Sequence, residues 1–172
     1  MKLGAQFYTL RDHCQTLEGL SESLKKVADI GYTTVQISGV CPYEPEWMKE
    51  QLDKNGLECV LTHWNAQEVL EDPVSVINKH RIFGCNNIGL GCMPGGWATE
   101  EMTHSFIEKY KEPAKIIAQN GAKFFMHNHH CEFIRCADGE MIFDKLINSF
   151  TPEELSFTLD TYWVQIGGGN PC

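Results

Sequence analysis

The chain has 172 residues, and its 23 acidic side chains outnumber its 14 basic ones, which gives a formal net charge of −9. A negative surface opposes binding to nucleic-acid backbones and to anionic lipids, so we expect neither kind of partner. Apolar residues make up 42% of the chain, yet no apolar run approaches the roughly 20 residues of a membrane helix or resembles a signal peptide. We therefore expect one globular domain over residues 1–172, located in the cytoplasm.

Eight cysteines are spread along the sequence without a single Cys-x-x-Cys pair. Structural zinc sites usually show that spacing, and a cytoplasmic protein keeps its thiols reduced. The cysteines are therefore predicted to be free thiols, and Cys59, inside the apolar run LECVL, is predicted to be a small core residue.

The first half of the chain alternates short β-branched segments with amphipathic ones. Strands are predicted over 3–9, 33–40 and 57–64, and the helices that follow them over 17–30, 45–55 and 72–84. Gly31 and Gly56 stand just past two of these helices, and Pro45 and Pro73 stand in first turns, which are the usual end signals.

The second half repeats this pattern. Strands are predicted over 86–93, 123–129 and 155–163, and helices over 99–120 and 141–150. Residues 94–97 (PGGW) and 137–140 are predicted to be loop and turn, and the final GGGNPC is predicted to form no element.

Six strands separated by five helices, without a hairpin, predict a parallel sheet with right-handed crossovers. A doubly wound open sheet and a (β/α)8 TIM barrel both fit. The first architecture usually carries a glycine-rich phosphate loop after its first strand, where this chain has QFYTLRD instead. Polar residues recur near the strand ends, as expected when every strand end faces one shared site. They are Gln6, Gln36, His63, His127, His129 and Asp160.

The predicted strands recur roughly every 30 residues, so a complete barrel would need about 240 residues. The chain ends after the sixth strand. We therefore expect a barrel truncated after that strand, made of the first six βα units. Its open edges would favour association into a homo-oligomer.

The densest group of potential ligands is His127-Asn128-His129-His130 with Glu132. Residues i and i+2 of a strand share a face, so His127 and His129 can point together to one side, and Glu132 can close around an ion. The alternative is one hydrogen-bonded core histidine beside solvated ones. Asp160 follows an apolar run and could be a metal ligand at the end of a strand or the start of an Asx-turn.

Aromatic residues near the strand ends could form the walls of a pocket. His63 could hydrogen-bond a substrate hydroxyl, while Phe7, Trp64 and Trp163 could contact the substrate. The alternative is that these are core aromatic residues beside a satisfied histidine.

Four segments together resemble the sugar phosphate isomerase/epimerase family with the xylose isomerase-like barrel, which is related to family 2 AP endonucleases. They are GAQFYTLRD at 4–12, GYTTVQISG at 31–39, HNHHCEF at 127–133 and LDTYWVQIGGGNP at 159–171. The resemblance implies a sugar substrate and a divalent ion (Mn, Mg, Co or Zn) held at the ends of the fifth to eighth strands. Asp160 matches the sixth-strand ligand, and the fifth-strand ligand lies among His127, His129 and Glu132. The ligands of the last two strands have no counterpart.

The activity implied by the resemblance is proton abstraction α to a carbonyl through an enediolate, with Glu132 and His129 as the catalytic candidates. Since half of the implied ligands are absent, we expect weak metal binding and little turnover. Two other functions remain open. One is an AP endonuclease-like hydrolase, which the charge of −9 disfavours, and the other is a non-catalytic sugar-binding remnant.

Overall fold

The computed structural model describes residues 2–171 and contains one six-stranded sheet in which all neighbouring strands are parallel. The strands follow one another in sequence order, as expected for consecutive βα units of a barrel. They are β1 (Gly4–Gln6), β2 (Thr34–Ile37), β3 (Glu58–His63), β4 (Asn87–Leu90), β5 (Lys123–His127) and β6 (Ser156–Thr158). The predicted barrel-type fold with six units is confirmed.

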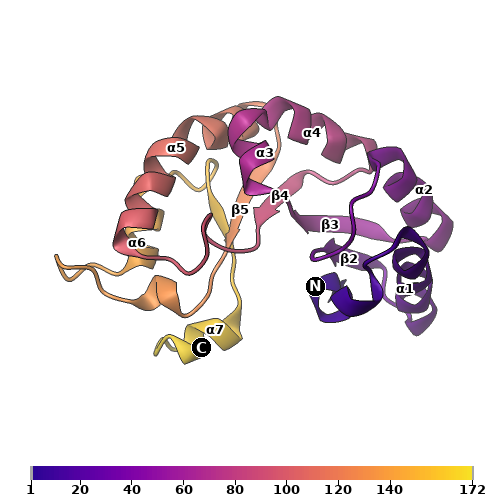
Figure 1. Cartoon of the computed structure of the whole chain (residues 1–172), viewed down its shortest axis with the longest axis horizontal. Coiled ribbons are helices and arrows are strands. Elements are labelled where there is room, and N and C mark those ends of the chain that lie inside the picture. The colour runs from indigo at the N-terminus through magenta and orange to yellow at the C-terminus, as the bar shows by residue number, and fades with distance from the viewer. Residues whose placement is uncertain (1, 172) are drawn as a thin grey trace.

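The longer helices form an arch around the outside of the sheet, while the N-terminus and the last helix lie on either side of an opening (Figure 1). The α-helices are α1 (Leu17–Ile30), α2 (Pro45–Asn55), α3 (Ala66–Glu71), α4 (Pro73–Ile82), α5 (Glu100–Gln119), α6 (Ile142–Ser149) and α7 (Thr161–Ile166). The shape is therefore a half-barrel with one open side. None of these helices is long and apolar enough to cross a membrane.

The helix ends predicted at Gly31, Pro45 and Gly56 are confirmed, and Thr16 is a cap that was not predicted. Thr16 accepts a hydrogen bond from the Gly19 amide at the start of α1, and Gly31 closes that helix at a φ of 110°. Pro45 begins α2 and Gly56, at a φ of 64°, ends it. These caps determine the residues at which the two helices begin and end.

All six predicted strands were longer than the observed ones, and two of them run into helices. The segment predicted as a strand over 3–9 is extended only to Gln6, because Phe7–His13 turns into a 3-10 helix, η1. The strand predicted over 155–163 ends at Thr158, because Asp160 caps α7. The short helix α3 was not predicted. Its N-cap is Asn65, whose side chain accepts hydrogen bonds from the backbone amides of Gln67 and Glu68.

The interior consists of two hydrophobic clusters under the same sheet. One gathers β4 and β5 with α5 and α6, and the other gathers β2 and β3 with α1 and α2. Trp64 packs against both clusters and links them. The described cysteines are all free thiols, as predicted, and Cys59 is buried in the second cluster.

Candidate functional site

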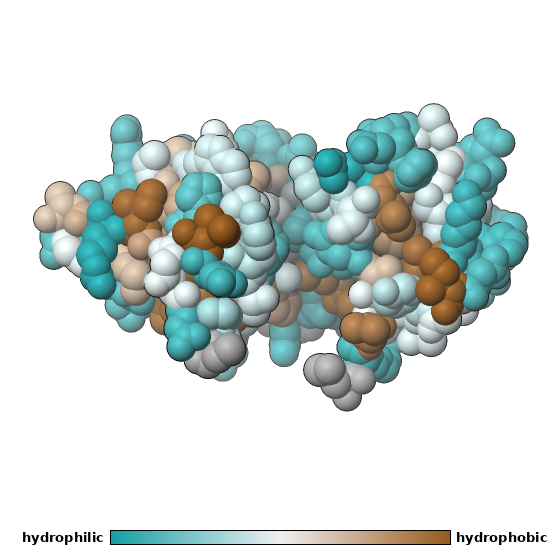
Figure 2. All heavy atoms as spheres, turned by 90° about the horizontal axis from the view of Figure 1, so that it is seen from below, coloured by the Kyte–Doolittle hydropathy of each residue, from teal (hydrophilic) through white to brown (hydrophobic). Residues whose placement is uncertain are grey.

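The principal cavity, of about 970 Å³, lies at the carboxyl ends of the strands. Each of the six strands contributes a lining residue at or just beyond its carboxyl end, namely Gln6, Ser38, His63, Gly91, His127 and Thr158. Seen from its open side, the molecule is hollowed between its N-terminal and C-terminal halves (Figure 2). A parallel sheet brings its strand ends to one edge, so side chains far apart in the sequence share this cavity.

Two of the predicted ligands, His127 and Asp160, lie side by side. His127 ends β5, and its Nε2 atom is 3.7 Å from Oδ2 of Asp160, which follows β6. The side chain of His127 is 11% exposed, and its Nδ1 atom is buried without a hydrogen-bond partner among residues 2–171. Burial is the main cause that lowers the pKa of His127, and the neighbouring His129 lowers it further.

Asp160 caps a helix, which is one of the two functions that the sequence left open, and its second oxygen stays free for the other. Its Oδ1 atom accepts hydrogen bonds from the amides of Tyr162 (2.9 Å) and Trp163 (3.5 Å), which makes it the N-cap of α7. Its other oxygen, Oδ2, faces His127. The aspartate is therefore held in one orientation by the helix that it caps.

Asn128, which sequence reasoning did not single out as a site residue, joins the loops after β5 and β6. It is fully buried, its side-chain oxygen accepts the Asp160 amide at 2.7 Å, and its side-chain nitrogen donates to the Asp160 carbonyl at 3.2 Å. This pair of hydrogen bonds holds the backbone of Asp160 in a fixed position relative to the end of β5. The only sequence signal was its place between His127 and His129.

His129 lines the same cavity, and its ring centroid is 4.9 Å from that of His127. Burial lowers the pKa of His129, while the carboxylates of Glu132 and Asp160 oppose that shift. The imidazole lies next to the predicted ligands, and within residues 2–171 no hydrogen bond occupies its ring nitrogens. It is therefore placed to exchange a proton with a bound molecule.

Glu132 takes a different position from its predicted partners. It is 1% exposed, does not line the cavity, and accepts hydrogen bonds at Oε2 from the His129 amide (2.7 Å) and the Cys131 thiol (3.3 Å). Its Oε1 atom is buried without a partner. In this arrangement the carboxylate stabilises the turn between His129 and the 3-10 helix η2 (Cys131–Phe133).

His63 ends β3 and is held by two neighbours. The amide nitrogen of Gln36 can only donate, so it donates to Nε2 of His63 (2.7 Å), and Nδ1–H of His63 donates to Oγ of Ser38 (2.8 Å). Burial, with the nearby His127 and His129, lowers the pKa of His63 to about 4. Ser38 was not predicted as a site residue, because the sequence placed it inside a strand over 33–40, whereas the strand ends at Ile37.

The aromatic residues lie in three different places. Trp163 lines the principal cavity, and its ring centroid is 5.1 Å from that of His129. Trp97, in the loop predicted over 94–97, has its ring centroid 5.0 Å from that of His129 and 6.1 Å from that of Trp163, and it was not predicted as a site residue. Trp64 lines a second cavity of about 420 Å³, and Phe7 is fully buried in the core.

A divalent ion can be tested against these donors. Nε2 of His127 and Oδ2 of Asp160 lie 3.7 Å apart, close enough for both atoms to bind one ion. Such donors suit Mn, Mg, Co or Zn, with water or substrate oxygens completing the coordination. The pair therefore fits an ion, although it supplies only two adjacent ligand atoms.

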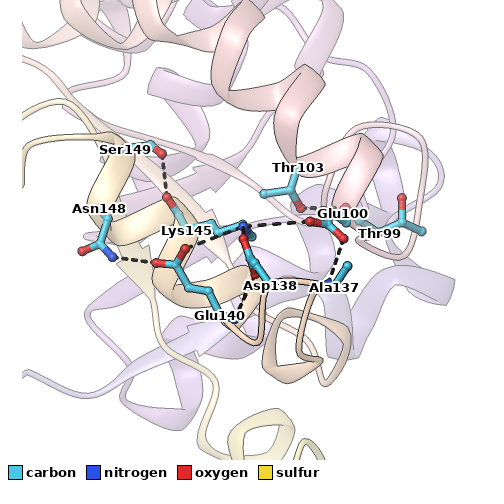
Figure 3. A network of polar contacts seen from close by, with 9 residues as sticks. All are labelled: Thr99, Glu100, Thr103, Ala137, Asp138, Glu140, Lys145, Asn148 and Ser149. Atoms are coloured by element: carbon cyan, nitrogen blue, oxygen red, sulfur yellow. Dashed lines mark hydrogen bonds and ion pairs between the residues drawn. The ribbon is translucent and has the colours of Figure 1, made fainter.

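Within residues 2–171, the group of three ligand atoms that lies within 4.8 Å is elsewhere, at Glu100, Cys136 and Asp138. Lys145 reaches into this group, donating to Asp138 and lying 3.9 Å from the Glu100 carboxylate (Figure 3). Because an ammonium group already balances these carboxylates, the cluster is best explained as the ion-pair network that holds the loop before α6.

The fold and the gathering of polar side chains at its strand ends define an α/β protein of the xylose isomerase-like TIM-barrel type. No family model and no curated protein matches the sequence. The resemblance to the sugar phosphate isomerase/epimerase and AP endonuclease barrels is confirmed by solved structures, at the level of the fold.

A sugar phosphate isomerase/epimerase from Parabacteroides distasonis superposes with a TM-score of 0.81 over 99% of this chain and 68% of its own, at 21% identity. An AP endonuclease of family 2 from Brucella melitensis gives 0.71 over 99% and 73%, at 14% identity. A D-allulose 3-epimerase from Methylomonas sp. gives 0.66 over 96% and 65%, at 17% identity. The chain thus spans about two thirds of the length of these barrels.

Proposed function

We propose that this protein is a sugar isomerase or epimerase that uses a divalent metal ion and moves a proton α to a carbonyl. The observation that carries the proposal is the meeting of His127, His129 and Asp160 in one cavity at the carboxyl ends of β5 and β6. Similar barrels bear the names of sugar epimerases, which supports a sugar as the substrate.

The residues divide into two proposed functions. Oδ2 of Asp160 and Nε2 of His127 would hold the ion, since they are adjacent and the first is oriented by its cap on α7. When bound, the ion would polarise the carbonyl of the sugar and lower the cost of charge on its oxygen. Asn128 would keep the two ligands next to each other through its hydrogen bonds to the Asp160 backbone.

Of the two residues predicted to be catalytic, the geometry favours His129 as the group that moves the proton. Its ring lines the cavity next to Trp97 and Trp163, whereas Glu132 does not line the cavity and accepts a hydrogen bond from the His129 backbone amide. Glu132 is therefore proposed as a positioning residue in this arrangement. The two indole rings would shield the reacting carbon from water, and His63 would bind a substrate hydroxyl.

The test is deuterium exchange at the carbon next to the carbonyl, followed by NMR in D2O with Mn²⁺ and ketohexoses. Asp160→Asn keeps an oxygen for the α7 cap but loses the charge, so we expect exchange to fall at least about 100-fold. The matched control is Asp53→Asn, which makes the same change at an exposed residue paired with Lys49. Equal exchange by both variants and the wild-type protein would contradict the proposal.

The proposed base has its own test. His129→Gln is expected to lower exchange about 100-fold or more, the usual size of a general-base contribution, while Mn²⁺ affinity measured by calorimetry stays nearly unchanged. Glu132→Gln is expected to affect exchange less than His129→Gln. A reversal of that order would make Glu132 the base.

A sugar-binding protein without catalysis is the second candidate, favoured by the fact that only two adjacent ligand atoms meet at the strand ends. It would bind ketohexoses in calorimetry and show no exchange with any metal. The same calorimetry tests the expectation of weak Mn²⁺ binding, which a tight single-site isotherm would overturn.

A further inference from the structure

The second cavity, of about 420 Å³, adjoins the principal one. It is lined by residues 37–45, which run from the end of β2 to the start of α2, and by side chains at the end of β3 and on α3 and α4. Because β2 and β3 each have a neighbouring strand on both sides, this cavity is formed by adjacent units inside the described sheet. Its volume is within the range of small-molecule sites, about 300–1,000 Å³.

The two cavities meet at His63 and Ser38, which line both of them. Nδ1–H of His63 donates to Oγ of Ser38 at 2.8 Å, so the two side chains are held together. The ring centroid of His63 is 5.3 Å from that of His127, one of the two proposed metal ligands. A molecule whose carbonyl lies at His127 therefore enters the second cavity if it extends past His63.

Beyond His63, the second cavity carries an indole ring beside a paired acid and base. Nε1–H of Trp64 donates to Oε2 of Glu68 at 3.2 Å, and Nζ of Lys79 donates to the same oxygen at 2.8 Å. Lys79 lowers the pKa of the Glu68 carboxyl through this hydrogen bond, so the pair is ionised near neutral pH.

This ion pair is accessible to a ligand. The side chains of Lys79 and Glu68 are 40% and 45% exposed. Within residues 2–171, both hydrogen bonds to the Glu68 side chain end on Oε2. Oε1 of Glu68 and the remaining N–H groups of Lys79 can therefore bind a molecule in the cavity while the pair stays formed.

We propose that the second cavity is a subsite for a second sugar ring, so that the protein binds a disaccharide with its ketose unit in the principal cavity. This inference rests on the proposed function. The ion pair offers an acceptor and a donor side by side to neighbouring hydroxyls, and hydrogen bonds to ionised groups are stronger than neutral ones. Trp64 and Tyr43, whose ring centroids are 6.1 Å apart, offer apolar contact to the C–H groups of a sugar.

Calorimetry at equal free Mn²⁺ tests this with D-fructose and with turanose, maltulose, leucrose and isomaltulose, in which glucose is joined to different oxygens of fructose. We expect at least one disaccharide to bind about tenfold or more tightly than D-fructose, the gain that one charge-assisted hydrogen bond gives. If every disaccharide binds as weakly as D-fructose or more weakly, the subsite is overturned and the proposed function stands. If no sugar binds, the subsite is overturned as well, and the exchange assay with ketohexoses decides the proposed function separately.

A substitution on α3 tests whether the gain comes from the second cavity. Glu68→Ala removes the carboxylate from the cavity, and Glu71→Ala is the matched control, since Glu71 lies on the same helix, is exposed and lines neither cavity. We expect Glu68→Ala to reduce the ratio of disaccharide affinity to fructose affinity about tenfold, and Glu71→Ala to leave this ratio unchanged. An equal ratio in both variants would show that the second ring binds elsewhere and would overturn the subsite.

Discussion

At the scale of single residues, His80 shows how burial sets the state of an ionisable group. It is 1% exposed on α4, and its Nδ1–H donates to the Val76 carbonyl at 2.8 Å. The Thr62 hydroxyl therefore donates to its Nε2 at 2.7 Å, so both ring nitrogens are used by the neutral form. Burial lowers the pKa of His80 to about 4 from an ordinary 6.5.

This residue predicts a pH dependence of stability. Between pH 6.5 and 4 the unfolded chain binds a proton at His80 that the folded chain refuses, so the free energy of unfolding must fall as the pH falls through this window. The expected loss is about 3 kcal/mol, with no contribution from this group above pH 6.5. Urea unfolding of the wild-type protein and of His80→Gln at several pH values measures it.

The wild-type protein should lose more stability than His80→Gln across this window. The exposed His104, changed in the same way, serves as the control. If wild type and His80→Gln kept the same difference in stability at every pH, His80 would not be the group responsible.

Individual site residues were predictable to different degrees for physical reasons. His127 and Asp160 follow apolar strand segments, and strand ends of a parallel sheet meet, so their proximity could be expected. Trp97 lies in a loop, where no periodicity indicates which way a side chain points. Ser38 lies just beyond β2, although the sequence predicted that this strand would continue past it. The orientation of Glu132 depends on the backbone of a 3-10 turn, which residue spacing alone does not determine.

At the scale of elements, helix caps determined the secondary structure where the intrinsic strand preference of the residues was misleading. Thr161, Tyr162 and Trp163 favour strands, so the sequence predicted a continuous strand over 155–163. The Asp160 side chain instead binds the amides that begin α7. The amphipathic helices α1 and α5 were predictable because their apolar stripes are long, whereas α3 has only six residues.

The cap of α5 gives a prediction at this scale. Oγ1 of Thr99 accepts the Met102 amide at 3.2 Å at the start of a 20-residue helix that packs against α4 and α6. We expect Thr99→Ala to lower the free energy of unfolding by about 1 kcal/mol and Thr99→Ser, which keeps the hydroxyl, to change it much less. Urea titrations of the three proteins measure this, and equal stability of the alanine and serine variants would contradict it.

At the scale of the whole molecule, the half-barrel exposes more surface than its mass requires. Its accessible area is 9327 Å², whereas a compact monomer of this mass would expose about 8,500 Å². The sheet begins at β1 and ends at β6, so each of these strands has a neighbour on one side only within the described chain. Unpaired strand edges readily pair with another chain.

We therefore predict that the protein self-associates through its sheet edges as its concentration rises. Leu3, just before β1, is 73% exposed, and Leu3→Lys would place a charge where another edge must dock. Ile30→Lys is the matched control, since Ile30 is 75% exposed at the end of α1, away from the edge strands. Sedimentation velocity over a range of concentrations should show weaker association for Leu3→Lys than for Ile30→Lys or the wild-type protein. A wild-type protein that remains monomeric throughout, or equal weakening by both variants, would exclude the edge at β1 as the contact.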